Sequence, residues 1–107
     1  IEPYRIGVEL RTLIGDVKYW IEHNTFPIDE IAVRFHHRLV AIHPFPNGNG
    51  RHSRLAADLL IVSLGGDRFT WGSANLVEPA ATRTRYIAAL KSADDHDIGL
   101  LLAFARS

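Results

Sequence analysis

The chain has 107 residues, of which 47% are hydrophobic and 22% are charged, so its composition fits one globular domain and excludes a disordered chain. Twelve basic residues balance twelve acidic residues, and no apolar stretch reaches the roughly 20 residues of a membrane span; we expect neither nucleic acid nor membrane as a partner. The absence of cysteine fits a reducing compartment, and we therefore expect a cytoplasmic protein.

Two helices are predicted in the first part of the chain. Apolar residues recur at three- and four-residue steps over residues 4 to 23, which is the pattern of one face of an amphipathic helix. The break that follows should place Asn24 or Thr25 as the cap of the next helix and Pro27 in its first turn. The apolar face of this second helix contains Ile28, Ile31, Phe35, Leu39 and Ile42.

Three further helices are predicted after the loop that follows Ile42. The first starts near Gly50 and ends at the pair Gly65-Gly66. Residues 67 to 78 have no clear period and predict a packed connection with at most one helical turn. Pro79 opens the next helix, and a short final helix carries Ile98, Leu101, Leu102 and Ala105. No strand is required, so the predicted fold class is all-α.

The loop between the two central helices carries the chemistry. It reads His43-Pro44-Phe45-Pro46-Asn47-Gly48-Asn49-Gly50-Arg51-His52-Ser53-Arg54. Its glycines tolerate positive φ, so consecutive N–H groups can converge on an anion at the start of the following helix. Arg51 and Arg54 lie one turn apart, and His43 is the side chain best suited to move a proton near neutral pH. This combination predicts phosphoryl or nucleotidyl transfer.

Two other interpretations are compatible with these residues. The glycine loop could be only a helix connection, although two arginines at a helix start oppose its dipole unless an anion is bound. The six histidines suggest a metal site, but their spacing matches no common zinc pattern and cysteine is absent. We expect His36 and His37 to flank the buried face of the second helix. The aromatic residues at helical spacing are predicted to be core, namely Trp20, Phe35, Trp71 and Phe104.

The loop resembles the signature of the Fic/Doc family, His-x-Phe-x-(Asp/Glu)-Gly-Asn-Gly-Arg-x-x-Arg. Seven of its eight specified positions match, namely His43, Phe45, Gly48, Asn49, Gly50, Arg51 and Arg54. The closing stretch Arg83-x-x-Tyr86-x-x-Ala89-Leu90 is also similar, and within the family the chain looks most like the members called mobile mystery protein B. The resemblance implies a Fic-type helical bundle in which this loop joins two central helices.

The resemblance also implies an activity, the transfer of AMP from ATP to a hydroxyl side chain of a target protein. His43 would be the general base on that hydroxyl, Phe45 would anchor the loop in the core and Tyr86 would line the nucleoside pocket. The phosphates would be held by the backbone of Gly48, Asn49 and Gly50 and by the side chains of Arg51 and Arg54.

Asn47 departs from the family pattern, because it stands where the signature has an acidic ligand for Mg²⁺. One neutral amide oxygen should bind that ion more weakly. The alternative prediction is therefore a catalytically weak or inactive module that binds nucleotide or a protein partner. Because the chain begins with Ile1, we expect residues 1 to 107 to be a Fic domain core. By the resemblance, the flap that holds the target would lie just upstream of residues 4 to 23. The autoinhibitory segment would lie in the upstream part, in a separate antitoxin, or nowhere.

Overall fold

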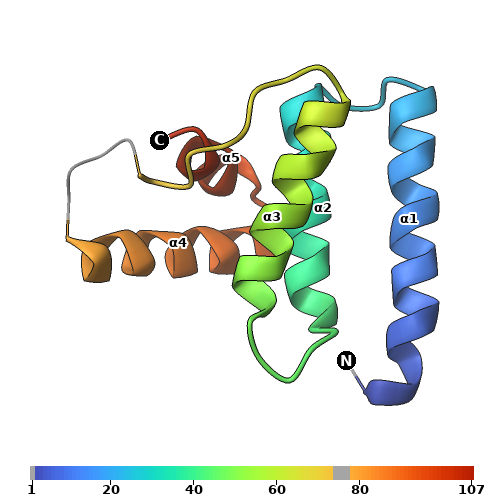
Figure 1. Cartoon of the computed structure of the whole chain (residues 1–107), viewed down its shortest axis with the longest axis horizontal. Coiled ribbons are helices and arrows are strands. Elements are labelled where there is room, and N and C mark those ends of the chain that lie inside the picture. Colours follow the sequence, from blue (N-terminus) through green and yellow to red (C-terminus); the bar gives the residue numbers. More distant parts are fainter. Residues whose placement is uncertain (1, 74–77) are drawn as a thin grey trace. The chain divides into compact units, whose positions relative to one another are not determined.

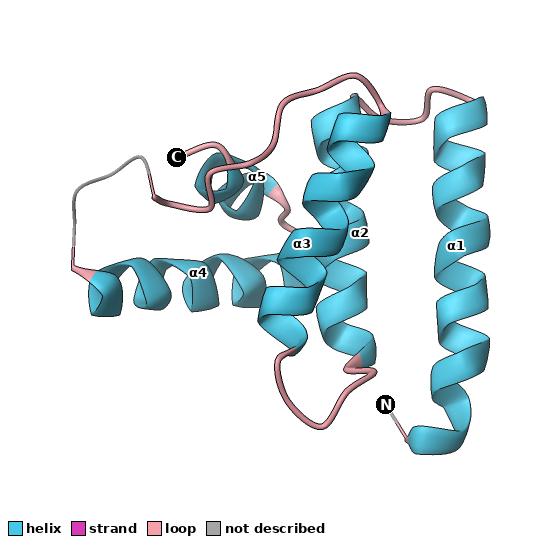
Figure 2. Cartoon of the chain, viewed as in Figure 1, coloured by secondary structure: helices cyan, strands magenta, loops and turns pink. Residues whose placement is uncertain are grey.

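The fold is all-α, as predicted, in a computed structural model that describes residues 2–73 and 78–107 (Figures 1 and 2). A short 3-10 helix, η1 (Pro3–Arg5), precedes five α-helices within these residues: α1 (Ile6–Glu22), α2 (Ile28–Ile42), α3 (Asn49–Ser63), α4 (Pro79–Asp94) and α5 (Gly99–Ala105). No strand occurs in the described ranges. The connection expected at residues 67 to 78 includes residues 74–77, which lie outside the described residues.

The chain divides into two compact units, Ile1–Asp67 and Arg68–Ser107. In the first unit α2 packs against both α1 and α3. The core between α1 and α2 consists of Leu13, Val17, Ile31, Leu39 and Ile42, which lie at helical spacing on the facing sides of the two helices. Burying each such side chain contributes about 1.5–3 kcal/mol, so this core fixes the end of α2 from which the candidate loop leaves.

The junction between α1 and α2 differs from the prediction at its cap. Neither Asn24 nor Thr25 caps α2, which has no side-chain cap. Asn24 instead has a left-handed backbone, with φ of 48°, and Thr25 donates its N–H to the Trp20 carbonyl at 3.1 Å. These two residues therefore terminate α1 rather than start α2. Pro27 is the N-cap, and its carbonyl accepts the Ile31 N–H at 3.0 Å.

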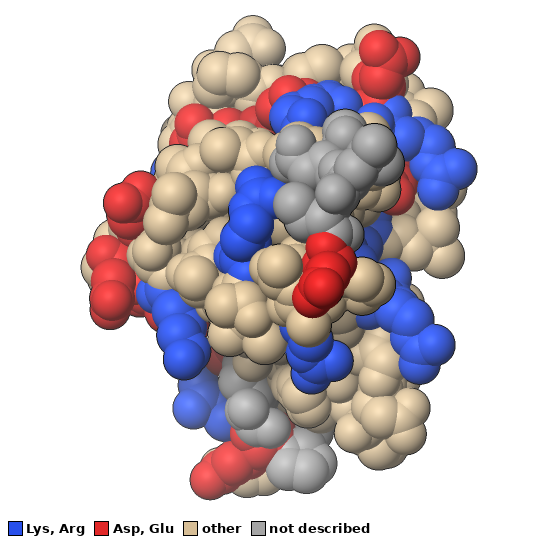
Figure 3. Space-filling model, turned by 90° about the vertical axis from the view of Figure 1, so that its left-hand side faces the viewer, with Lys and Arg blue, Asp and Glu red and all other residues tan. Residues whose placement is uncertain are grey.

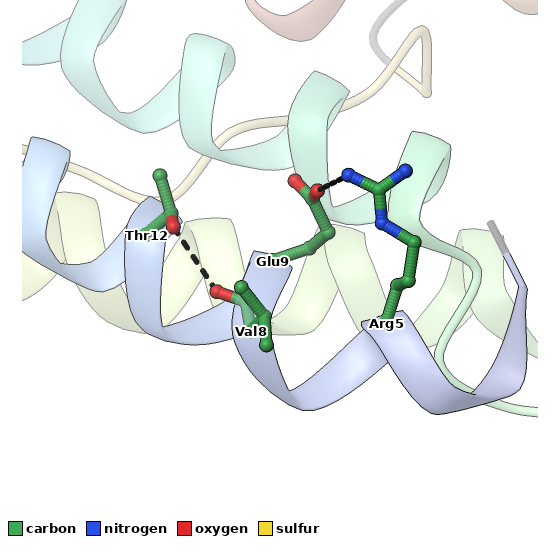
Figure 4. A network of polar contacts seen from close by, with 4 residues as sticks. All are labelled: Arg5, Val8, Glu9 and Thr12. Carbon is green, nitrogen blue, oxygen red and sulfur yellow. Dashed lines mark hydrogen bonds and ion pairs between the residues drawn. The ribbon is translucent and has the colours of Figure 1, made fainter.

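The start of α1 is supported by contacts one turn apart. Arg5 reaches Glu9 at 3.4 Å, and the Thr12 hydroxyl donates to the Val8 carbonyl at 3.1 Å (Figure 4). Exposed ion pairs of this kind contribute about 0–1 kcal/mol. A second partly exposed ion pair, between Arg38 and Asp16, joins α2 to α1. On the molecular surface, basic and acidic side chains both occur on the face shown in Figure 3.

In the second unit α4 packs against α5. Phe104 of α5 is buried, as predicted, and its ring lies 5.3 Å from that of Tyr86 on α4. Gly72 has φ of 82°, and a Cβ there would come within 2.8 Å of the Phe104 ring, so this close approach requires glycine. Trp71 is only half-buried. Within the described residues, no helix combines the length and the apolarity that crossing a membrane needs.

Candidate active site

His43 occupies the point where α2 ends. Its backbone is left-handed, with φ of 56° and ψ of 59°, and its N–H donates to the Leu39 carbonyl at 3.3 Å. A non-glycine residue in this region costs about 1–2 kcal/mol, and such residues cluster at functional sites. The left-handed turn stops the helix and leaves His43 exposed at the entrance to the loop. An imidazole in this position can reach a proton on another molecule.

The other end of the loop forms an open helix start. Gly48 is the N-cap of α3, with φ of 74°, and its carbonyl accepts the His52 N–H at 3.0 Å. The first turn of α3 contains neither a side-chain cap nor an acidic residue. The N–H groups of Asn49, Gly50 and Arg51 lie in the first turn, where the helix has no carbonyl four residues earlier to accept them. They therefore have no partner within the helix. They are therefore suited to an anionic ligand.

Arg51 and Arg54 add positive charge to this helix start. Arg51 is exposed, and its Nη2 lies 3.9 Å from the position that a Cβ on Gly48 would occupy, so the guanidinium lies beside the N-cap. Arg54 follows one turn later and is half-buried. Because cations at a helix N-terminus oppose its dipole, an anion bound at this helix start would offset the unfavourable interaction.

The side chain of Asn49 clamps the loop. Its Oδ1 accepts the Phe45 N–H at 3.0 Å and its Nδ2 donates to the Phe45 carbonyl at 2.8 Å. The residue is only 6% exposed. Sequence reasoning assigned the Asn49 backbone to phosphate binding and missed this side-chain role, although the four-residue spacing from Phe45 is the signal that could have indicated it.

Replacing Asn49 with alanine should lower the free energy of unfolding by about 1–3 kcal/mol, because the Phe45 backbone loses both partners. Urea unfolding measures this change. The matched control is Asn47→Ala, which removes an exposed amide two residues away and should change stability by less than about 0.5 kcal/mol. Equal effects of the two substitutions would contradict the clamp.

The prediction that Phe45 anchors the loop in the core is wrong. Its side chain is 44% exposed, and its ring packs edge-on against the imidazole of His52 with centroids 4.7 Å apart. The loop lies beyond Ile42, the last core residue of α2, so Phe45 has no core to enter. It braces the loop against α3 from outside.

His36 lies deeper than predicted. Rather than flanking the buried face of α2, it has no exposed surface. Burial lowers the pKa of its imidazole to about 4, and the positive charges of Arg54 and His37 act in the same direction. A hydrogen bond with the Ser53 backbone raises the pKa and so opposes this shift. A bond that favours the protonated ring is one in which the ring N–H is the donor. His36 is therefore an uncharged side chain that links α2 to α3. It lies three residues before the buried Leu39, on the same face of α2.

The loop does not provide the ligands that Mg²⁺ prefers. Asn47 is exposed, and residues 43 to 57 contain no aspartate or glutamate. Among the described residues, no group of three or more His, Cys, Asp or Glu could hold a metal ion. Magnesium is usually bound through one or two carboxylates together with phosphate oxygens. The donor set of this loop does not fit a Mg²⁺ site held by the protein.

Comparison with known proteins finds similarity over the part of the chain that contains this loop. A model of the Fic/DOC family matches residues 2–61. The chain is 32% identical over 100 residues to Protein adenylyltransferase Fic of Drosophila virilis, covering 90% of this chain and 19% of that protein. It is 34% identical over 88 residues to Protein adenylyltransferase fic-1 of Caenorhabditis elegans, covering 79% of this chain and 16% of that protein. The chain thus spans less than a fifth of the length of these relatives.

A solved structure shows the same fold. Fic-1 (residues 134–508) from C. elegans superposes with a TM-score of 0.71 at 27% identity, covering 99% of this chain and 29% of that one. The match of the family model covers α1, α2, the loop and most of α3. The residues that build the candidate site, from His43 to Arg54, therefore all lie inside the matched region.

Proposed function

The chain belongs to the Fic/DOC family, and we propose that it is a protein adenylyltransferase, which moves AMP from ATP to a hydroxyl side chain of a target protein. The observation that carries this proposal is the loop, which has an exposed histidine at one end and a helix start without a side-chain cap at the other. The relatives named protein adenylyltransferase are the second support.

In the proposed mechanism His43 is the general base. Its imidazole accepts the proton of the target hydroxyl, and the hydroxyl oxygen attacks the α-phosphorus of ATP. A new phosphorus–oxygen bond forms to the target, while the bond from the α-phosphorus to the bridging oxygen breaks and pyrophosphate leaves. The exposure of His43 suits a substrate that is itself a protein.

The start of α3 binds the phosphates in this proposal. The backbone N–H groups of Gly48, Asn49 and Gly50 donate to phosphate oxygens, and Arg51 and Arg54 balance the charge that builds up on pyrophosphate as it leaves. The positive end of the helix dipole acts in the same direction. Since Asn49 uses its side chain to hold the loop, its contribution to the ligand comes from the backbone.

Radioactive ATP labelled at different phosphates tests the proposed reaction. Adenylyl transfer predicts that label at the α-phosphate enters a protein band in a cell lysate, whereas label at the γ-phosphate does not. Transfer of the γ-label alone would identify a kinase and contradict the proposal. The target protein, and any antitoxin or autoinhibitory segment that regulates it, would be identified from the labelled or co-purifying proteins.

Substituting Asn47 with aspartate should lower the Mg²⁺ concentration for half-maximal label transfer on the order of tenfold, because a carboxylate is a better ligand for this hard cation than a neutral amide oxygen. The measurement is a Mg²⁺ titration at fixed ATP. Asn47→Gln, which keeps a neutral amide, is the control and should follow the wild type. If aspartate leaves the titration unchanged, residue 47 does not approach the metal.

A second candidate function follows from the same residue. With Asn47 in place of a carboxylate, the chain could be a module that binds nucleotide or a protein partner without turnover. Calorimetry would then detect ATP binding with little dependence on Mg²⁺, and no label transfer would accompany it. Robust labelling by the wild-type chain would exclude this candidate.

A further inference from the structure

The loop contains two asparagine–glycine pairs whose surroundings differ. Asn47 precedes Gly48 in the irregular part of the loop, and its side chain is exposed. Asn49 precedes Gly50 inside α3 and is 6% exposed. The two pairs have the same local chemistry, so any difference in their reactivity must come from the fold.

Asparagine followed by glycine can modify itself. The backbone nitrogen of the glycine attacks the side-chain Cγ of the asparagine, a new C–N bond closes a five-membered succinimide and ammonia leaves. Water then opens the ring to give an aspartyl or an isoaspartyl residue. The reaction consumes only water, and a glycine favours it because no side chain shields its nitrogen.

The structure permits this reaction at one pair and opposes it at the other. At residue 47 the side chain is exposed, the backbone is not helical, and the N–H of Gly48 donates to no backbone carbonyl among the described residues. At residue 49 the oxygen and the nitrogen of the side-chain amide are both hydrogen-bonded to the Phe45 backbone, and the residue lies in the first turn of α3. Ring closure at Asn49 requires the clamp and the first turn of α3 to open.

We propose that Asn47 is a site of spontaneous deamidation and that its aspartyl product supplies the carboxylate that the loop otherwise lacks. The consequence for metal binding rests on the proposed function, but the modification itself does not. Conversion would replace a neutral oxygen at the phosphate-binding loop with a charged one, which is the type of ligand that Mg²⁺ prefers. The loop would thus change its donor set with the age of the molecule.

Peptide mapping by mass spectrometry tests the modification. The folded chain and the same chain in urea are incubated at mildly alkaline pH, and conversion of each amide to acid is followed with time. In the folded chain Asn47 should convert faster than Asn49 by on the order of tenfold or more, since Asn49 must first lose two hydrogen bonds. In urea the two rates should become similar. Equal conversion rates of Asn47 and Asn49 in the folded chain would overturn the proposal. It would also be overturned if Asn47 stays intact in the folded chain while Asn47 and Asn49 both convert in urea.

Calorimetry of ATP binding with and without Mg²⁺ tests the consequence. The aspartyl product, prepared as Asn47→Asp, should bind ATP more tightly when Mg²⁺ is present, whereas Asn47→Gln should show little effect of the ion. If Asn47→Asp shows no effect either, the new carboxylate is not a metal ligand. Failure of the proposed transferase activity would appear separately, as ATP binding without label transfer, and would leave the mass-spectrometric result unchanged.

Discussion

Replacing His43 with alanine is expected to slow AMP transfer by roughly 10²–10⁴-fold, because the target hydroxyl loses the base that takes its proton. ATP affinity should change little, since the proposed phosphate site is at the start of α3 and not at His43. The measurements are the initial rate of α-label transfer and calorimetric ATP binding. Together they separate loss of the base from loss of the nucleotide site.

Two further variants make this result specific. Asparagine tolerates the left-handed backbone at position 43 but cannot act as a base, so His43→Asn should lose activity without the backbone strain that alanine brings. His23 is an exposed histidine that also caps a helix C-terminus, and His23→Ala should keep full activity. If either His43 variant transfers label at the wild-type rate, His43 is not the base.

The chain should lose stability in mild acid because of His36. Its folded-state pKa is about 4, below the 6.5 of an exposed histidine, so the unfolded chain binds the proton first as pH falls. Stability contributed by the neutral ring is complete above pH 6.5 and is lost progressively toward pH 4, a change of about 3 kcal/mol. Urea unfolding at several pH values across this interval measures the loss.

A variant without the histidine isolates this effect from the titration of carboxylates. His36→Gln keeps an N–H donor for the Ser53 backbone but does not titrate in this range. Its stability should therefore fall less steeply than that of the wild type between pH 6.5 and pH 5. The nearby charges, Arg54 on α3 and His37 on α2, are present in both chains. Parallel stability curves would show that His36 is not buried in neutral form.

Helix boundaries could be predicted from the sequence because they depend on local patterns. Apolar residues at helical spacing, such as Leu13 and Val17 on α1, placed the buried face correctly, and Pro79 marked the start of α4. The loop residues and the family could also be recognised, because the signature lies within twelve consecutive positions. The family match is independent support for that reading.

The errors concern side chains whose partners lie elsewhere in the fold. The burial of His36 depends on the packing of α3 around Ser53, which lies seventeen positions later. The two adjacent histidines, His36 and His37, give no local indication of this in the sequence. Phe45 appeared to be a core residue by its type, but its position beyond the end of α2 decides its exposure. The prediction of Asn24 as a helix cap was wrong for a different reason. Asparagine suits both the start of a helix and the left-handed residue that ends one, and Asn24 has the left-handed backbone.

The clamp between Asn49 and Phe45 makes the shape of the loop a local property. Both partners lie within five consecutive residues, and the bracing ring of His52 comes only three residues later. The loop therefore needs little from the rest of the protein to keep its conformation. Residues 43 to 54, grafted between the helices of another helical hairpin, should therefore keep their backbone conformation.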